Sequence, residues 1–236
     1  MDEFASIAPS VLRRDPECGF RAARVLAGSN GKAKLADARW AVEQRLRGDI
    51  TLAHSELRVA TEHNFAEPID LLPEQRAVYR AAARGYLTLF ADTPVRSVEI
   101  TKQRFLPELQ VRFVANPGIA LEHADGTLEL RTVRTAGRTP EIDGVAVHTA
   151  ALLFGHDTGA PRRSVVRLVA ADLLALDVTT LDVDPDHERP AAVEWVEQRL
   201  TRWQTVADGG RVVAGSDCSS CTFIWDCPAH ATARSS

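Results

Sequence analysis

Four cysteines near the two ends of the chain place the strongest constraint on what it can fold into. Cys218, Cys221 and Cys227 lie within ten residues of one another, and Cys18 stands two hundred residues upstream. Two residues separate Cys218 from Cys221, which lets both sulfurs face one metal centre, and five more residues lead to Cys227. Cys18 supplies the fourth thiolate, so a tetrathiolate centre would join the two ends of the chain.

The cysteine spacing alone does not decide the chemistry of this centre. Structural zinc and an iron-sulfur cluster both accept four thiolates. Disulfides suit an oxidising compartment, but the first residues, MDEFASIAPS, begin acidic and lead into no apolar run of a secretory signal. Unliganded buried cysteines are the remaining alternative. His187 and His230 are weak substitute ligands, because a single histidine is usually not a metal ligand.

Composition narrows the class of protein. With 236 residues and 45% hydrophobic content, the chain can bury a sizeable core, and we expect one domain over 1–236 with a cluster-binding lobe formed by 8–28 and 209–230. The net charge of -4 argues against coating nucleic acid through charge alone, although a local basic groove is compatible with it. The sequence has no run of about 18 apolar residues, which predicts a cytoplasmic protein without a membrane partner.

Hydrophobic periodicity predicts an α/β fold with a mixed sheet. A first helical region follows Ser10 as its N-cap. Later helices are expected over 33–47, 73–90 and 141–154, and a last helix is expected to open at Pro190 and to end before Gly209. Strands are expected over 95–100, 109–114, 119–121, 127–135, 165–170 and 174–178.

The cysteine pattern resembles the iron-sulfur centre of RecB-like nucleases in the PD-(D/E)XK superfamily. These include CRISPR-associated RecB-like exonucleases and the nuclease domain of AddB-type helicase-nucleases. The segment 7–21, IAPSVLRRDPECGFR, looks like the family's first segment, which presents one cysteine at the start of a helix. The resemblance spans most of the chain. It implies a restriction-endonuclease-like mixed sheet flanked by helices, and a 4Fe-4S cluster bound by Cys18, Cys218, Cys221 and Cys227 in place of zinc.

The catalytic motif of that family is degenerate in this chain. The family holds Mg²⁺ or Mn²⁺ with an acidic residue on one core strand and an acidic-x-Lys motif on the next, because hard cations prefer oxygen ligands. The aligned positions here carry Gly118, Thr132 and Arg134. Glycine and threonine offer no carboxylate, and arginine does not deprotonate near neutral pH. The resemblance therefore implies a pseudo-nuclease without catalytic residues.

Two departures from this alignment are open. A shifted register over Glu129-Leu130-Arg131 restores one acid, but it turns the face that includes Val133 towards the site. An active nuclease would then need a migrated acid set such as Glu122, Asp125 and Glu129.

Two further motifs of the family also lack a clear counterpart in this sequence. His54 could be a displaced version of the family's upstream histidine. The alternative interpretation is that His54 is a solvent-facing histidine on a loop or strand. The glutamine-tyrosine helix motif falls on 143–148, where neither residue is kept.

Three functions follow from these observations. The favoured one is a catalytically degenerate protein that binds DNA or a protein partner in DNA processing, repair or defence. Its nucleic-acid candidates are Arg131, Arg134 and Arg138, whose charged groups suit phosphate oxygens; the alternative is that Arg134 pairs with a nearby carboxylate. The others are an active metal-dependent DNA exonuclease and a structural or redox iron-sulfur module.

Overall fold

The structure is a computed structural model that describes residues 6–9, 38–90, 92–155 and 165–208. The chain divides into two compact units, one made of 1–34, 103–115 and 190–236, and the other of 35–102 and 116–189. The four cysteines, His230 and the expected first helix lie outside the described residues. The cluster-binding lobe and the single domain therefore stay predictions.

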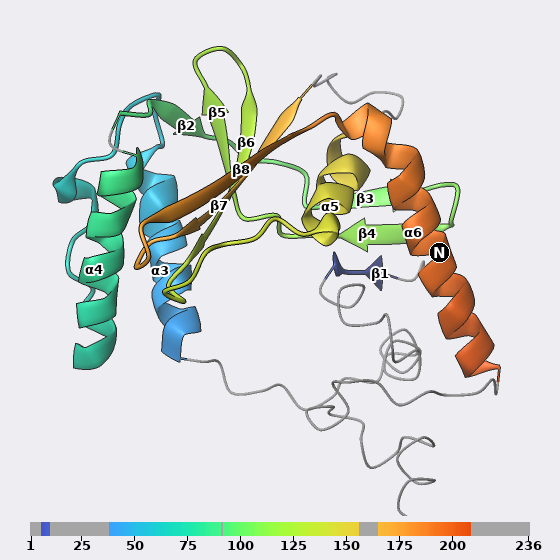
Figure 1. Cartoon of the computed structure of the whole chain (residues 1–236), viewed down its shortest axis with the longest axis horizontal. Coiled ribbons are helices and arrows are strands. Elements are labelled where there is room, and N and C mark those ends of the chain that lie inside the picture. The colour runs from blue at the N-terminus through green and yellow to red at the C-terminus, as the bar shows by residue number, and fades with distance from the viewer. Residues whose placement is uncertain (1–5, 10–37, 91, 156–164, 209–236) are drawn as a thin grey trace, which may run out of the picture. The chain divides into compact units, whose positions relative to one another are not determined.

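The second unit contains a five-stranded sheet whose strand order is β2-β5-β6-β7-β8. Its strands are β2 (Val95–Ser97), β5 (Ile119–His123), β6 (Leu128–Arg134), β7 (Val166–Asp172) and β8 (Asp177–Val183). Neighbouring strands are antiparallel except for β6 and β7, which are parallel. Parallel neighbours need a crossover connection, and helix α5 (Gly144–Phe154) lies between them in the sequence (Figure 1). The predicted mixed α/β fold is confirmed.

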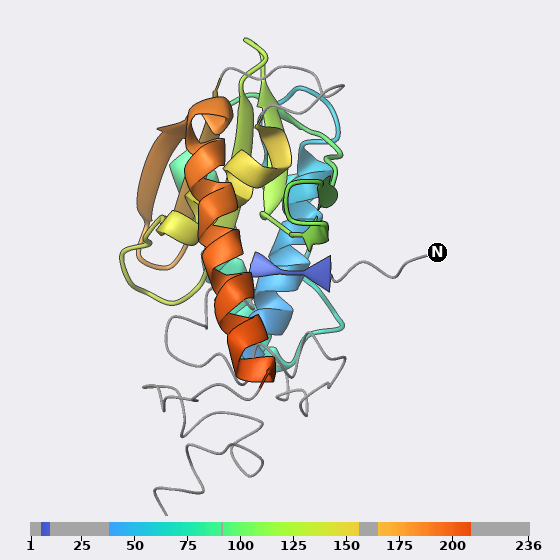
Figure 2. The same ribbon diagram turned by 90° about the vertical axis from the view of Figure 1, so that its right-hand side faces the viewer.

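Helices cover both faces of this sheet. Helices α3 (Ala38–Ala53) and α4 (Pro73–Phe90), which the 3-10 turn η1 (Glu62–Asn64) separates in the sequence, share one hydrophobic cluster with Leu121 and Val133. Helix α5 shares another cluster with Ala120 and Leu130 (Figures 1 and 2). Because successive strand residues point to opposite faces, neighbours along β5 and β6 belong to different clusters.

The first unit contains a three-stranded sheet and most of the last helix. Strand β4 (Val111–Val114) lies between β1 (Ser6–Ile7), which is parallel to it, and β3 (Gln103–Leu106), which is antiparallel. Helix α6 (Pro185–Ala207) starts within the second unit and continues into the first (Figure 2). No helix among the described residues is both long and apolar enough to cross a membrane.

Several element boundaries differ from those expected. The prediction that Pro190 opens the last helix is wrong, because the Asp184 carboxylate caps a turn five residues earlier by accepting bonds from the backbone N–H groups of Asp186 and His187. The strand expected near 174–178 exists but begins later, as β8 at Asp177, because Leu176 has a φ of 56° and lies in the turn before it. The helix over 73–90 is confirmed.

The buried carboxylate of Asp172 joins the ends of β6 and β7. Its Oδ2 accepts hydrogen bonds from the backbone N–H groups of Ala136 (2.8 Å) and Gly137 (2.9 Å). Its Oδ1 accepts from those of Leu174 (3.0 Å) and Ala175 (2.9 Å). The backbone N–H of Arg138 also donates to Oδ2 at 3.4 Å, so one side chain satisfies five donors on two loops and fixes the segment that follows β6.

Replacing Asp172 by alanine should lower the free energy of unfolding by about 3 kcal/mol or more, because five backbone donors lose a charged acceptor in a buried site. Urea unfolding followed by circular dichroism measures this change. Asp182→Ala is the matched control, because Asp182 forms a half-exposed pair with Arg167 and should cost less than about 1 kcal/mol. Equal losses for the two variants would contradict the role given to Asp172.

Candidate functional site

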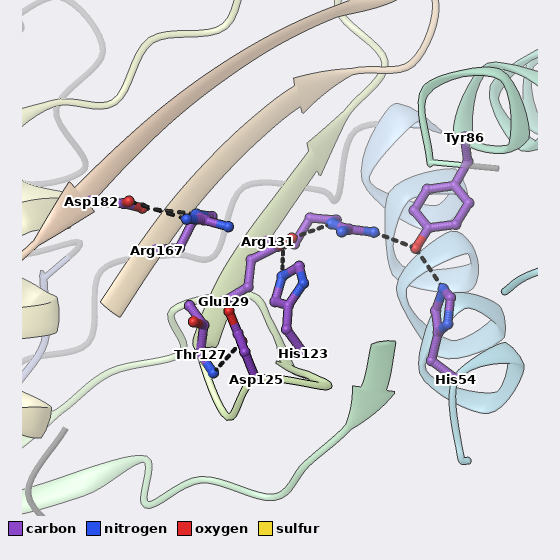
Figure 3. A network of polar contacts seen from close by, with 9 residues as sticks. All are labelled: His54, Tyr86, His123, Asp125, Thr127, Glu129, Arg131, Arg167 and Asp182. Carbon is purple, nitrogen blue, oxygen red and sulfur yellow. Dashed lines mark hydrogen bonds and ion pairs between the residues drawn. The ribbon is translucent and has the colours of Figure 1, made fainter. Parts of the chain in front are cut away.

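A chain of polar contacts runs through the core between the sheet and the helices α3 and α4 (Figure 3). The hydroxyl of Tyr86 on α4 lies 2.9 Å from Nε2 of His54, which follows α3, and 2.6 Å from Nη1 of Arg131 on β6. Nε of Arg131 donates to Oε1 of Glu129 at 2.5 Å, and Oε2 of Glu129 lies 2.7 Å from Nε2 of His123 on β5. Helix α4, the residue that follows α3, and two strands therefore contribute to one network.

Hydrogen bonding determines the protonation states at the His54 end of this chain. Nδ1 of His54 lies 3.0 Å from the carbonyl oxygen of Arg58, which can only accept, so Nδ1 carries the proton. Burial lowers the pKa of His54, and the charge of Arg131 lowers it further, so the ring is neutral at pH 7. Burial raises the pKa of Tyr86 to about 12. Its hydroxyl therefore donates to Nε2 of His54 and accepts from Arg131.

Arg131 is a core residue and forms a buried ion pair. Its side chain is 1% exposed, and the side chain of Glu129 is 3% exposed. The guanidinium carbon lies 3.7 Å from the ring centroid of Phe90, a cation-π contact. Because every approach to this guanidinium is filled by protein, the expectation that Arg131 contacts phosphates is wrong for this structure.

His54 is fully buried, so the alternative that it faces solvent is wrong. Its ring contacts Tyr86 and the backbone carbonyl of Arg58, and its equivalence to the family's histidine stays a prediction. Tyr86 and His123 were not predicted. Tyr86 lies on the apolar face of α4, where its ring packs against Phe90 with centroids 5.0 Å apart, so the sequence pattern shows an ordinary core tyrosine.

The degenerate positions Gly118 and Thr132 lie side by side at the start of β5. Gly118 has a φ of 107°, which favours glycine. A Cβ atom at this position would lie 2.5 Å from the carbonyl oxygen of Arg131 and 3.2 Å from Oγ1 of Thr132. The backbone here therefore has no space for an aspartate.

The migrated acid set is divided between two faces of the sheet. Glu129 is paired with Leu121 across β5 and β6, and the next residue, Glu122, is paired with Leu128, so the two acids point to opposite faces. Glu122 forms an ion pair with Arg96. Asp125 is exposed and accepts a hydrogen bond from the backbone N–H of Thr127 in the turn. Within the described ranges, no three His, Cys, Asp or Glu side chains gather as a metal site.

Arg134 and Arg138 differ from most arginines of the second unit in that their guanidinium groups are exposed and unpaired. Arg134 ends β6, and Arg138 lies in the loop that Asp172 holds. Neither guanidinium makes a hydrogen bond or ion pair with any described residue, whereas Arg96 and Arg167 are both paired with carboxylates. The alternative that Arg134 pairs with a carboxylate does not hold in the described part of the chain.

Comparison with known proteins finds likenesses only among solved structures. No family model matches the chain, and no curated protein matches it. Among solved structures it is similar to one described as the crystal structure of SSO0001, with 11% sequence identity, a TM-score of 0.42, and coverage of 98% of this chain and 89% of that chain.

The neutral state of His54 makes the stability depend on pH. The unfolded state binds a proton below about pH 6.5, whereas the folded state has a lower pKa and resists protonation. Stability from His54 is therefore present above this pH and is lost as the pH falls, by up to about 1.4 kcal/mol per pH unit. Urea unfolding of the wild type and His54→Gln between pH 5.5 and 7.5 should show a flatter dependence for the variant. The exposed His63→Asn should keep the wild-type slope; equal slopes for all three would contradict this assignment.

Proposed function

We propose that this chain is a catalytically degenerate RecB-like nuclease-fold protein that binds the phosphate backbone of DNA as an accessory factor in DNA processing, repair or defence. The proposal rests on the contrast between two positions at the open end of the β5–β6 hairpin, Gly118 and Arg134. Gly118 has no space for a carboxylate, and Arg134 presents an unpaired charge. Metal ligands are replaced by a cation, which suits binding of phosphates without cleavage.

The position of the hairpin supports the family resemblance. The motif of the family needs acids on two neighbouring strands, and Gly118 and Thr132 lie next to each other at adjacent strands β5 and β6. Glu129 and Arg131 have the spacing of an acidic-x-Lys motif, with arginine in place of lysine. Both side chains are buried in the core, where they form an ion pair with each other. A buried pair without access for solvent or substrate favours a structural role over metal-assisted hydrolysis.

Purified protein should not cleave linear DNA in the presence of Mg²⁺ or Mn²⁺, and it should bind DNA in a salt-sensitive manner. Arg134→Glu/Arg138→Glu should weaken binding at least about tenfold at low salt, and it should reduce the slope of log K against log salt by about 2, because two phosphate contacts are lost. Fluorescence anisotropy over a salt series measures both changes.

A matched double variant separates the proposed contact from net charge. Arg80→Glu/Arg84→Glu makes the same change of charge on α4, and it should leave most of the affinity intact. Equal weakening by both double variants would show that the surface around Arg134 is not the contact. Metal-dependent cleavage that disappears in Glu129→Gln would instead favour the active-nuclease alternative. Absence of DNA binding by the wild type would favour a structural or redox module.

We also propose that Cys18, Cys218, Cys221 and Cys227 bind a 4Fe-4S cluster. The donor set supports this, since the chain has four cysteines and the tetrathiolate uses all of them. These residues lie outside the described ranges, so the support is chemical and comes from their spacing. A cytoplasmic location suits such a cluster, because thiols stay reduced there. Zinc is the alternative for the same ligands.

Anaerobically purified protein should be brown and contain about four irons and four sulfides per chain, as a cluster of this type requires. Cys18→Ser and Cys221→Ser should each bleach the colour and lower the melting temperature to a similar extent, because each removes one ligand of the clip between the chain ends. Iron and acid-labile sulfide analysis with visible absorption checks this. Colourless protein with one zinc would support the zinc alternative, and a stable, brown Cys18→Ser protein would show that the fourth ligand is misassigned.

A further inference from the structure

The three-stranded sheet of the first unit has one buried face and one exposed face. Strands β3 and β4 run side by side (Figure 1), and Phe105 is directly opposite Arg112, so both side chains point to the same side. The apolar residues of the opposite side are buried: Ile7, Leu106, Val111 and Phe113. The exposed side, which we call the outer face, consists of Ser6, Gln103, Phe105, Arg112 and Val114.

Arg112 is a cation without a carboxylate beside it on the outer face. Its guanidinium makes no hydrogen bond, ion pair or cation-π contact with any described residue. Glu108, the nearest acid in the sequence, lies in the turn between β3 and β4, beyond the buried pair of Leu106 and Val111. None of the five outer residues is acidic. The charge of the outer face is therefore complementary to an anion.

Phe105 places an aromatic ring next to this charge. Phe105 is 39% exposed and Val114 is 36% exposed, while the other three residues of the outer face are polar or charged. A stable protein interface buries about 800 Å² on each partner, which two partly exposed side chains on strands of two to four residues do not provide. A small ligand with a planar aromatic group and a negative charge matches the outer face better.

We propose that the outer face binds single-stranded DNA, with one unpaired base stacked on the ring of Phe105 and the neighbouring phosphate bound by Arg112. Stacking on aromatic side chains and arginine–phosphate contacts are the interactions by which proteins hold single strands. The Cβ atoms of directly opposite residues lie about 5 Å apart, so one nucleotide can reach both side chains. The inference rests on the proposed DNA binding and specifies it, because the faces of bases inside a duplex are closed to Phe105.

Fluorescence anisotropy of a labelled thymidine oligonucleotide of about 12 nucleotides measures the binding, and a duplex of the same length is the comparison. Phe105→Ala and Phe105→Leu should each weaken single-strand binding about tenfold, because both lack an aromatic face, and should leave duplex binding unchanged. Phe105→Trp should retain the affinity, and its added fluorescence should be quenched by the oligonucleotide. Ile69→Ala, which removes an exposed apolar side chain of the second unit, is the matched control and should bind normally.

Arg112→Gln should weaken single-strand binding and should lower the slope of log K against log salt by about 0.7, because one phosphate contact is lost. Arg84→Gln removes an exposed arginine of α4 and should change neither quantity. Thermal unfolding followed by circular dichroism should give the wild-type melting temperature for Phe105→Leu, whose side chain stays apolar. This comparison separates loss of stacking from loss of the fold.

Unchanged single-strand affinity in both Phe105→Ala and Phe105→Leu, or equal losses for single strand and duplex, would overturn the inference. Self-association of the wild type that disappears in Phe105→Ala would overturn it as well, and would assign the outer face to a second copy of the chain. If Arg134→Glu/Arg138→Glu loses DNA while Phe105→Ala binds single strands normally, the proposed function survives and this inference fails. If only the Phe105 variants lose single strands, the outer face is a DNA contact and the surface around Arg134 is not.

Discussion

The buried ion pair between Glu129 and Arg131 is the interaction on which the arrangement of the second unit depends. Both residues lie on one face of β6, and each would cost several kcal/mol if the other were removed. A register slip of one residue would carry them into the apolar cluster around α5 and would expose Leu128 and Leu130 to the polar network. The pair therefore fixes which face of the sheet the helices α3 and α4 cover.

The alternation of side chains between the two faces of β6 gives two of its arginines different roles. Arg131 faces the core, where Glu129 and Tyr86 hold its guanidinium, and Arg134 lies three residues later at the exposed end of the strand. Asp172 holds the loop that follows, and so keeps this end of the strand in place without neutralising the arginine. One strand thus combines a rigid, charge-balanced middle with a charged end that is free to bind an anion.

Helices and strands with a strong hydrophobic periodicity can be predicted from the sequence, whereas contacts between segments far apart in the chain cannot. The helix over 73–90 and the β5–β6 hairpin follow from local pattern and turn residues. The hydrogen bonds from Thr135 to Glu43, ninety-two residues away, join the end of β6 to α3, and no local rule contains that information. Arg131 was misplaced for the same reason, since a charged strand residue reads as exposed until Glu129 and Tyr86 are seen beside it.

Gly118 separates two explanations for a degenerate motif. If only side chains had changed, the backbone would still accept an aspartate, and activity would be a substitution away. Here a Cβ would meet the carbonyl oxygen of Arg131 at 2.5 Å in a conformation that favours glycine. For the proposed pseudo-nuclease, Gly118→Asp alone would therefore not restore a metal-binding carboxylate, because the main chain before β5 would have to move away from the carbonyl oxygen of Arg131.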